Sequence, residues 1–191
     1  MRLNLGCGNR KVPGWVNVDK VQACHPDQVV DLEQLPWPWA DDSVEEVMLS
    51  HVLEHLGEDT KTYLGLIKEL YRVCRNGAKI VILVPHPRHD FFLDDPTHVR
   101  TITPGGLALF SQKANRQWIA SGAANTPLGI YHGVDFSIES VNLPLDEPWR
   151  TRHERKEIAD DELQHAVRHY NNVVVEFQIV LRAVKPAGSM G

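Results

Sequence analysis

Residues 3–19 read LNLGCGNRKVPGWVNVD, and this stretch decides the fold that we predict for the chain. One short apolar run ends in Gly6-Cys7-Gly8, and a second ends in the acid Asp19. Two glycines after a buried strand allow a tight turn whose backbone amides can approach a ligand closely. An acid at the tip of the next strand can accept hydrogen bonds from ribose hydroxyls. The pattern therefore predicts a site for a nucleotide-type cofactor.

The spacing within this stretch argues against a dinucleotide. A dinucleotide fingerprint has a third glycine, and its acid follows about 20 residues later. Here residues 9–11 are Asn, Arg and Lys, and Asp19 arrives too early for a full crossover helix. The stretch instead resembles motif I of the class I S-adenosylmethionine (SAM) dependent methyltransferases, in a variant whose first helix shrinks to a turn closed by Pro13-Gly14. A glycine-rich turn without a ligand is the alternative interpretation of the motif alone.

The resemblance covers residues 3–84 and implies a set of cofactor-binding residues. In the family an acid meets the adenine amino group and the next backbone N–H meets a ring nitrogen, and Asp31 and Leu32 match that pattern. The alternative for Asp31 is a turn or helix cap. Residues 50–55, SHVLEH, match the family segment that borders the transferable methyl group. The cofactor-binding residues so predicted are Gly6, Gly8, Asp19, Asp31, Leu32, Ser50 and His51.

Three histidines are candidates for a catalytic base: His51, His89 and His98. His51 follows a predicted strand, and we expect His55 one helical turn further along the same face. The other two belong to residues 86–100, HPRHDFFLDDPTHVR, where titratable groups and two phenylalanines together suggest a pocket wall. An adjacent Asp can fix the tautomer of a histidine, so His89 with Asp90 and His98 with Asp95 are the expected pairs.

Metal binding is a second interpretation of the same histidines. The HxxxH spacing of His51 and His55 suits a metal, but the HExxH order is absent. In the later loop His86, His89, Asp90, Asp95 and His98 offer possible ligands without a tight spacing that singles them out. A hydrogen-bonded loop explains these residues as well, and our prediction names no metal.

Composition bounds the class of protein. A chain of 191 residues with 42% apolar content suits a single domain, which we assign to residues 1–187 with a tail at 188–191. The formal net charge of −5 disfavours nucleic acid as a partner. Cys7, Cys24 and Cys74 form no CxxC pair, no signal peptide precedes the first strand, and no apolar run approaches a membrane span. We therefore expect a cytoplasmic protein without membrane contact.

The hydrophobic patterns predict an α/β fold of the Rossmann-like class I methyltransferase type. We expect a mostly parallel seven-stranded sheet with helices on both faces, a reduced first helix and a helical insertion before the last strand. Residues 60–75 carry the stripe of an amphipathic helix, which Asn76-Gly77 would end, and the following β-branched run suits a strand covered on both faces. The later segments are predicted as a helix from Thr103, a substrate-side loop at 112–133, a strand at 134–143, one charged helix at 152–170 and a strand at 173–184.

The resemblance implies an enzyme that transfers a methyl group from SAM to a hydroxyl or amine of a small-molecule or glycan-type acceptor. The run DPTHVR at residues 95–100, followed by Thr103-Pro104, is similar to small predicted methyltransferases, some of which are linked to surface-polysaccharide biosynthesis. The alternatives are a SAM-binding protein with other chemistry or a regulatory role, and a nucleic-acid methyltransferase. The net charge, and Ser50-His51-Val52-Leu53 in place of an N-P-P-Y-type segment, disfavour the last of these.

Overall fold

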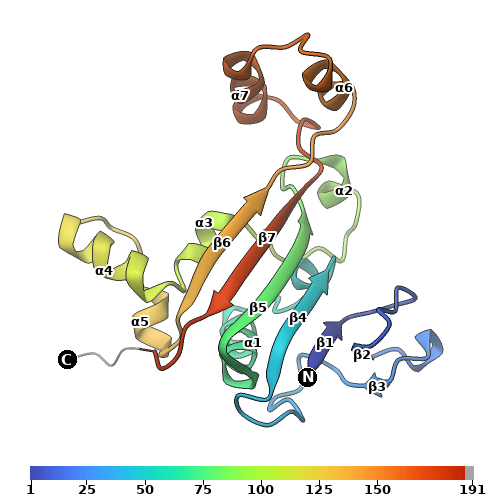
Figure 1. The fold of residues 1–191 in the computed structure, drawn as a ribbon, viewed down its shortest axis with the longest axis vertical. Coiled ribbons are helices and arrows are strands. Elements are labelled where there is room, and N and C mark those ends of the chain that lie inside the picture. Colours follow the sequence, from blue (N-terminus) through green and yellow to red (C-terminus); the bar gives the residue numbers. More distant parts are fainter. Residues whose placement is uncertain (188–191) are drawn as a thin grey trace.

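A computed structural model describes residues 1–187, and the predicted tail at 188–191 lies outside the described residues. Within this part of the chain, strands form a seven-stranded sheet in the order β3-β2-β1-β4-β5-β7-β6 (Figure 1). Strands β3, β2, β1, β4 and β5 are parallel, and β7 is antiparallel to both of its neighbours. The predicted sheet is thus confirmed. The strands are β1 (Arg2–Leu5), β2 (Val16–Asp19), β3 (Gln28–Val29), β4 (Val44–Ser50), β5 (Cys74–Pro85), β6 (Phe136–Asn142) and β7 (Glu176–Ala183).

The helices are short except for the one between β4 and β5. No helix separates β1 from β2, so the reduced first crossover is confirmed, and two helices lie between β6 and β7 as the predicted insertion. The helices are η1 (Gln22–Cys24), η2 (Leu53–His55), α1 (Thr60–Val73), α2 (Asp90–Leu93), α3 (Pro104–Ala108), α4 (Gln112–Ser121), α5 (Leu128–His132), α6 (Trp149–Glu154) and α7 (Asp160–His169). Among residues 1–187, each helix is too short or too polar to cross a lipid bilayer.

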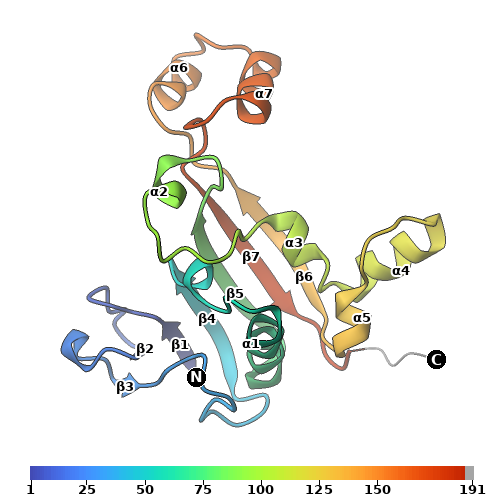
Figure 2. The ribbon, with the colours of Figure 1, turned by 180° about the vertical axis from the view of Figure 1, so that it is seen from behind.

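The main core lies between α1 and one face of the sheet. Asp59 caps α1 by accepting a hydrogen bond from the N–H of Thr62, and the buried stripe of α1 includes Leu66 and Leu70. The alternate residues Ile80, Ile82 and Val84 of β5 point to the same side and are fully buried. Figure 2 shows α1, α2 and α3 on this face. Trp37 and Trp39 pack edge to face within this core with ring centroids 5.7 Å apart.

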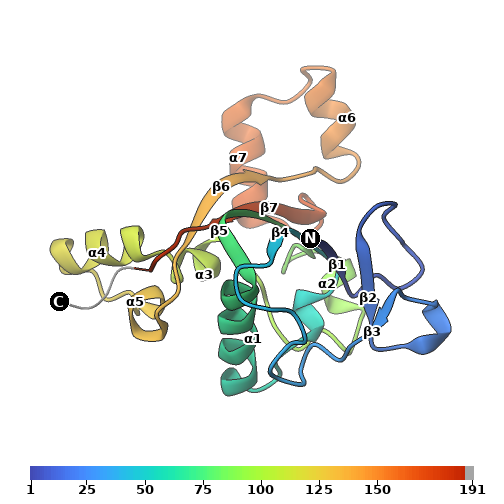
Figure 3. The same ribbon diagram turned by 60° about the horizontal axis from the view of Figure 1, so that its bottom comes forward.

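The opposite face of the sheet lacks the expected second layer. Along β4, β5 and β7, none of the described helices lies over this face, and α6 and α7 lie beyond the strand ends instead (Figures 1 and 3). The prediction that β5 is covered on both faces was wrong, because the shortened first and second crossovers supply no helix to cover it. The side chains on this uncovered face are half-buried: they are Glu46 and Met48 of β4, Lys79, Val81 and Leu83 of β5, and Gln178, Val180 and Arg182 of β7.

Three further sequence predictions were wrong in detail. Helix α1 ends at Val73, and Gly77, with φ +75°, lies in an irregular start of β5 where the pairing with β4 shifts register. The predicted loop at 112–133 forms α4 and α5, which lie beside β6 and away from the carboxyl ends of the parallel strands (Figure 3). The predicted helix at 152–170 is split into α6 and α7, because the backbone reverses at Lys156, whose φ is +57°.

Candidate cofactor and active site

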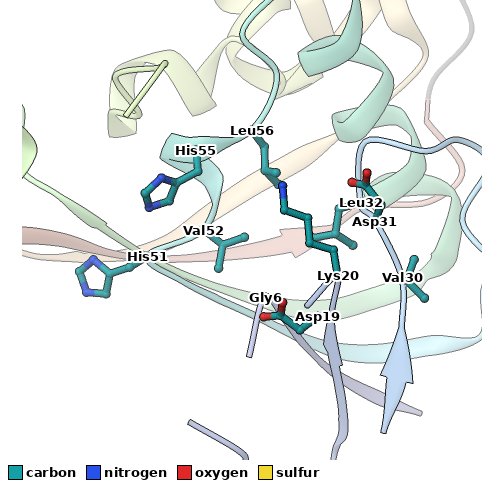
Figure 4. A pocket seen from close by; sticks show the side chains of 10 residues that line it. All are labelled: Gly6, Asp19, Lys20, Val30, Asp31, Leu32, His51, Val52, His55 and Leu56. Carbon is teal, nitrogen blue, oxygen red and sulfur yellow. The ribbon is translucent and has the colours of Figure 1, made fainter. Parts of the chain in front are cut away.

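A pocket of about 190 Å³ lies at the carboxyl ends of β1, β2, β3 and β4. Open α/β sheets bind ligands at this edge, where neighbouring strand ends leave room between their loops. His51 and His55 lie at one end of the pocket, and Val30 and Asp31 lie at the other (Figure 4). The lining residues are Gly6, Asp19, Lys20, Val30, Asp31, Leu32, His51, Val52, His55 and Leu56.

The structure brings five of the predicted cofactor-binding residues together in this pocket. They are Gly6, Asp19, Asp31, Leu32 and His51, which come from the carboxyl ends of four different strands. The other two, Gly8 and Ser50, do not line the pocket, although Gly8 is bonded to one of the lining residues. Ser50 is the last residue of β4 and lies directly before His51.

Gly6 needs to be a glycine at its position. Its φ is +66°, a left-handed conformation that residues with a side chain rarely adopt. A β-carbon there would lie 2.5 Å from Cγ2 of Val52, far inside van der Waals contact. The absent side chain therefore lets the β1 turn pack directly against the segment after β4 and keeps the backbone accessible from the pocket.

The Asp19 carboxylate organises the turn around it. Its Oδ2 accepts a hydrogen bond from the Gly8 N–H at 2.8 Å, and its Oδ1 accepts one from the Val21 N–H at 2.9 Å. Each carboxylate oxygen has a further lone pair, so Asp19 can still accept hydrogen bonds from a ligand. Asp31 is similar, since its Oδ1 accepts from the Glu33 N–H at 3.0 Å while the residue lines the pocket. Asp31 is thus a turn cap and a pocket residue at once.

His51 lies between two carboxylates at the end of β4. Its backbone N–H donates to the Leu83 carbonyl at 2.8 Å, and its φ of +54° turns the chain sharply away from the strand. Nε2 is 3.1 Å from Oε2 of Glu176, and Nδ1 is 3.6 Å from Oε1 of Glu54. The pKa of His51 is raised, chiefly by its interaction with Glu54 and also by Glu176, while burial opposes the shift. The expectation that His51 and His55 share a helical face was wrong, because η2 begins only at Leu53.

His89 lies outside this pocket and has a different partner from the one predicted. Its Nδ1 accepts the Phe91 N–H at 3.1 Å as the N-cap of α2, and its Nε2 is 3.1 Å from Oδ2 of Asp146. Asp90 bonds instead to Asn172, at 2.8 Å. The predicted pairing of His89 with Asp90 was wrong, because α2 begins at Asp90 and carries the two side chains in different directions.

His98 lies against η2 rather than with the other histidines of its loop. Its Nδ1 is 2.9 Å from the Phe92 carbonyl, and its Nε2 is 3.9 Å from Oδ2 of Asp95, the expected partner. Its ring centroid is 4.6 Å from that of His55. Within residues 1–187, ligand atoms of Glu54, His55 and His98 lie within 4.8 Å of one another, whereas the five potential ligands of residues 86–98 are not gathered into one site.

Several pocket residues were not predicted from the sequence. Lys20, Val30 and Val52 each adjoin a predicted residue, and His55 and Leu56 follow His51 within five positions, so the same strand ends that carry the motif also carry them. Glu54 lies inside the SHVLEH segment, but the sequence does not indicate that its side chain is buried. Glu176 begins β7, far from His51 in the sequence, and only the pairing of β7 with Pro85 of β5 brings it to the site.

Comparison with known proteins gives both a sequence match and a fold match. Residues 7–82 match a family described as methyltransferase domain. Among curated proteins, none matches this chain.

Solved structures with this fold come from several organisms. A SAM-dependent methyltransferase from Archaeoglobus fulgidus aligns with 19% identity and a TM-score of 0.59, over 95% of this chain and 85% of the other. One from Methanosarcina mazei aligns with 14% identity and a TM-score of 0.54, over 96% of this chain and 92% of the other. One from Mesorhizobium loti aligns with 17% identity and a TM-score of 0.50, over 95% and 89%.

Proposed function

We propose that this chain, which the family match and the fold identify as a class I SAM-dependent methyltransferase, methylates a hydroxyl or amine of a small-molecule or glycan-type acceptor. The convergence of Gly6, Asp19, Asp31, Leu32 and His51 on one pocket supports this proposal most directly. These residues were selected from the sequence by their resemblance to the family's cofactor motifs, and they come from four strand ends. Residues 1–187 would form the single catalytic domain.

The residues of the pocket fit SAM. The turn at Gly6 leaves the space that a side chain would fill, next to Val52. Asp19 retains free lone pairs for ribose hydroxyls, and Asp31 with Leu32 lies at the far end, where the adenine would bind. We assign Gly6 and Gly8 to the methionine end of the cofactor, Asp19 to its ribose and Asp31 to its base.

His51 is our candidate for the catalytic base. SAM supplies a methyl group on a positively charged sulfur, which is already activated for displacement. The protein's part is to align the acceptor and, for a hydroxyl acceptor, to remove its proton. With the Nε2–H of His51 held by Glu176, Nδ1 is free to accept that proton, and Glu54 stabilises the imidazolium that results. We assign His89 a structural role instead, since it does not line the pocket.

The finer features of the proposal rest on the sequence. The acceptor class follows the similarity of the DPTHVR run, at residues 95–100, to methyltransferases linked to polysaccharide synthesis. The net charge of −5 argues against a polyanionic acceptor. Within the described residues Cys7, Cys24 and Cys74 are free thiols, which supports a reducing, cytoplasmic setting.

Calorimetric titration with SAM tests the cofactor site. We expect the full chain to bind SAM, and we expect the variants Asp19→Ala and Asp31→Ala each to bind it at least about tenfold more weakly, because each loses hydrogen bonds worth about 1.5–3 kcal/mol to charged groups. Titration with NAD should show no comparable binding.

The matched control is Asp94→Ala, which removes an exposed carboxylate outside the pocket and should leave the affinity for SAM unchanged. Circular dichroism would establish that each variant is folded. If the folded wild-type chain did not bind SAM, or if Asp94→Ala weakened binding as much as the pocket variants do, the proposed site would be wrong.

A further inference from the structure

Glu54 is a buried acid whose side chain lacks a hydrogen-bond partner. The residue is 1% exposed, and among residues 1–187 neither Oε1 nor Oε2 has a partner within hydrogen-bond distance. The nearest ring nitrogen given for it, Nδ1 of His51, is 3.6 Å away. Burial of a carboxylate without compensation is costly, so such a group calls for a bound cation or another explanation.

Two histidines present free ring nitrogens close to this carboxylate. The Nδ1 of His98 is 2.9 Å from the Phe92 carbonyl, which can only accept, so Nδ1 carries the proton. The Nδ1 of His55 is 2.9 Å from Oγ1 of Thr97, whose own hydroxyl donates to Asp95 at 2.6 Å, so this Nδ1 is a donor as well. In the neutral form of both rings Nε2 therefore has a free lone pair. Metal-binding histidines are oriented by outer hydrogen bonds of this kind.

Backbone hydrogen bonds attach the loop that carries His98 to η2. The N–H groups of Val99 and Arg100 both donate to the Glu54 carbonyl, at 3.0 and 3.1 Å. The Arg100 guanidinium donates to the Gly57 carbonyl at 2.7 Å and lies over the Tyr63 ring, 4.3 Å from its centroid. The three side chains thus stand on two segments that are held in register, so their approach is a property of the fold rather than of one flexible loop.

We propose that Glu54, His55 and His98 bind a divalent transition-metal ion such as Zn²⁺. Two imidazoles and one carboxylate are ligands that this class of ion prefers, and three protein ligands leave positions open for another group. Their ligand atoms lie within 4.8 Å of one another. Two metal–ligand bonds of about 2.1 Å reach at most about 4.2 Å, so side-chain movements of roughly 0.6 Å would close the site around one ion.

The position of this site suggests what the ion would do. His55 is both a proposed ligand and a lining residue of the cofactor pocket, and Glu54 faces His51. An ion there would lie between the cofactor and the loop at residues 86–100. We infer that it holds the acceptor hydroxyl and makes its proton easier to remove; this role, unlike the site itself, rests on the proposed methyl transfer.

Zinc binding by the chelator-stripped full chain tests the site without any need for activity. We expect calorimetry to show one Zn²⁺ per chain, and Mg²⁺ to bind much more weakly because imidazole suits it poorly. Glu54→Gln and His98→Ala should each weaken Zn²⁺ binding at least about tenfold. In the metal-free state Glu54→Gln should be at least as stable as the wild type, since it removes a buried charge without a hydrogen-bond partner. Added Zn²⁺ should raise the melting temperature of the wild type but not of Glu54→Gln or His98→Ala.

The matched control is the double variant His165→Ala/His169→Ala, which removes an exposed histidine pair on α7 with ring centroids 4.3 Å apart. It should bind Zn²⁺ as the wild type does. Three results would overturn the proposal: no Zn²⁺ uptake by folded wild-type protein, a Zn²⁺ affinity in Glu54→Gln and His98→Ala equal to that of the wild type, or loss of uptake in the control alone. SAM titration of the same variants separates this failure from that of the proposed function, because neither Glu54 nor His98 lines the pocket proposed for SAM.

Discussion

At the scale of single residues, two asparagines hold the loop that stands in place of a first helix. Asn4 donates through Nδ2 to the Arg10 carbonyl at 2.9 Å and to Oδ1 of Asn17 at 3.0 Å. The same Oδ1 accepts the Val12 N–H at 2.7 Å. Asn4 stands where the family often has an acid, and Arg10 stands near the third-glycine position. The first departure, Asn4, therefore fixes the loop by joining the Arg10 backbone carbonyl to the Asn17 side chain.

Glu176 is expected to tune the basicity of His51. The Glu176 carboxylate is 3.1 Å from Nε2 of His51 and favours the protonated ring, as Glu54 does more strongly. In Glu176→Gln, we expect the pKa of His51 to fall toward its ordinary value, because one of its two negative neighbours becomes neutral. NMR titration of the His51 ring in chelator-treated protein would measure this.

The control for this titration is Glu139→Gln, which removes a carboxylate paired with Arg182 on β6 and β7, away from His51. This variant should leave the pKa of His51 unchanged. An unchanged midpoint in Glu176→Gln would show that Glu176 does not tune this ring, and the assignment of His51 as the base would then lose its main support.

At the scale of elements, the α6–α7 insertion is attached to the loop after β5 by several polar contacts. The Arg88 guanidinium donates to the carbonyls of Val167 and Arg168 in the last turn of α7, which are otherwise free at a helix end. His89 contacts Asp146, which precedes α6. Asn172 bonds to Asp90 on the other side of the insertion. The insertion is thus tied to the segment that carries both His89 and His98.

Arg88→Ala should loosen α7 without unfolding the sheet. A hydrogen bond from a charged group contributes about 1.5–3 kcal/mol, and a loss of about 1.4 kcal/mol speeds local opening about tenfold. We therefore expect amide exchange in residues 160–169 to accelerate by about tenfold or more while β5 stays protected. Hydrogen-exchange mass spectrometry measures both regions at once.

Arg182→Ala is the matched control, since its guanidinium pairs with Glu139 at 2.8 Å and does not touch the insertion. Exchange in α7 should be unaffected there. Equal protection of α7 in Arg88→Ala and wild type would contradict the view that Arg88 anchors the insertion.

At the scale of the whole molecule, the two faces of the sheet differ in how they are covered. Alternate residues of β5 are fully buried against the α1 layer, whereas Val81 and Leu83 between them are half-buried on the other face. The figures show the same asymmetry, with α1, α2 and α3 on one side (Figure 2). The stability of the chain should therefore come mainly from one side of the sheet.

Two valines of β5 offer a matched test of this asymmetry. Val84→Ala removes a side chain that is 1% exposed, and we expect it to lower the free energy of unfolding by about 2–3 kcal/mol. Val81→Ala makes the same chemical change on the open face and should cost about 1 kcal/mol or less. Chemical denaturation of the two variants compares them directly, and equal losses would show that the second face is as well packed as the first.

Much of the fold could be predicted from the sequence because its signals are local. The segment from Gly6 to Asp19 holds a turn and a strand end within a few residues, and the stripe of α1 repeats with the period of a helix. The strand predicted to precede His51 is β4, which ends at Ser50. In contrast, residues 112–133 contain three glycines and a proline, so α4 and α5 were missed. Residues 152–170 contain no glycine or proline to mark the reversal at Lys156, so α6 and α7 were merged.

The sequence by itself determined the succession of strands up to β5, the reduced first crossover and half of the residues that line the pocket, because each depends on residues close together in the chain. Only the tertiary structure decided the partners of the histidines. His55 meets Thr97 and His98 across a loop docked on η2, His89 meets Asp146, and His51 meets Glu176 through the antiparallel pairing of β7 with β5. Such pairs depend on the register of distant segments, and no local pattern of residues specifies that register.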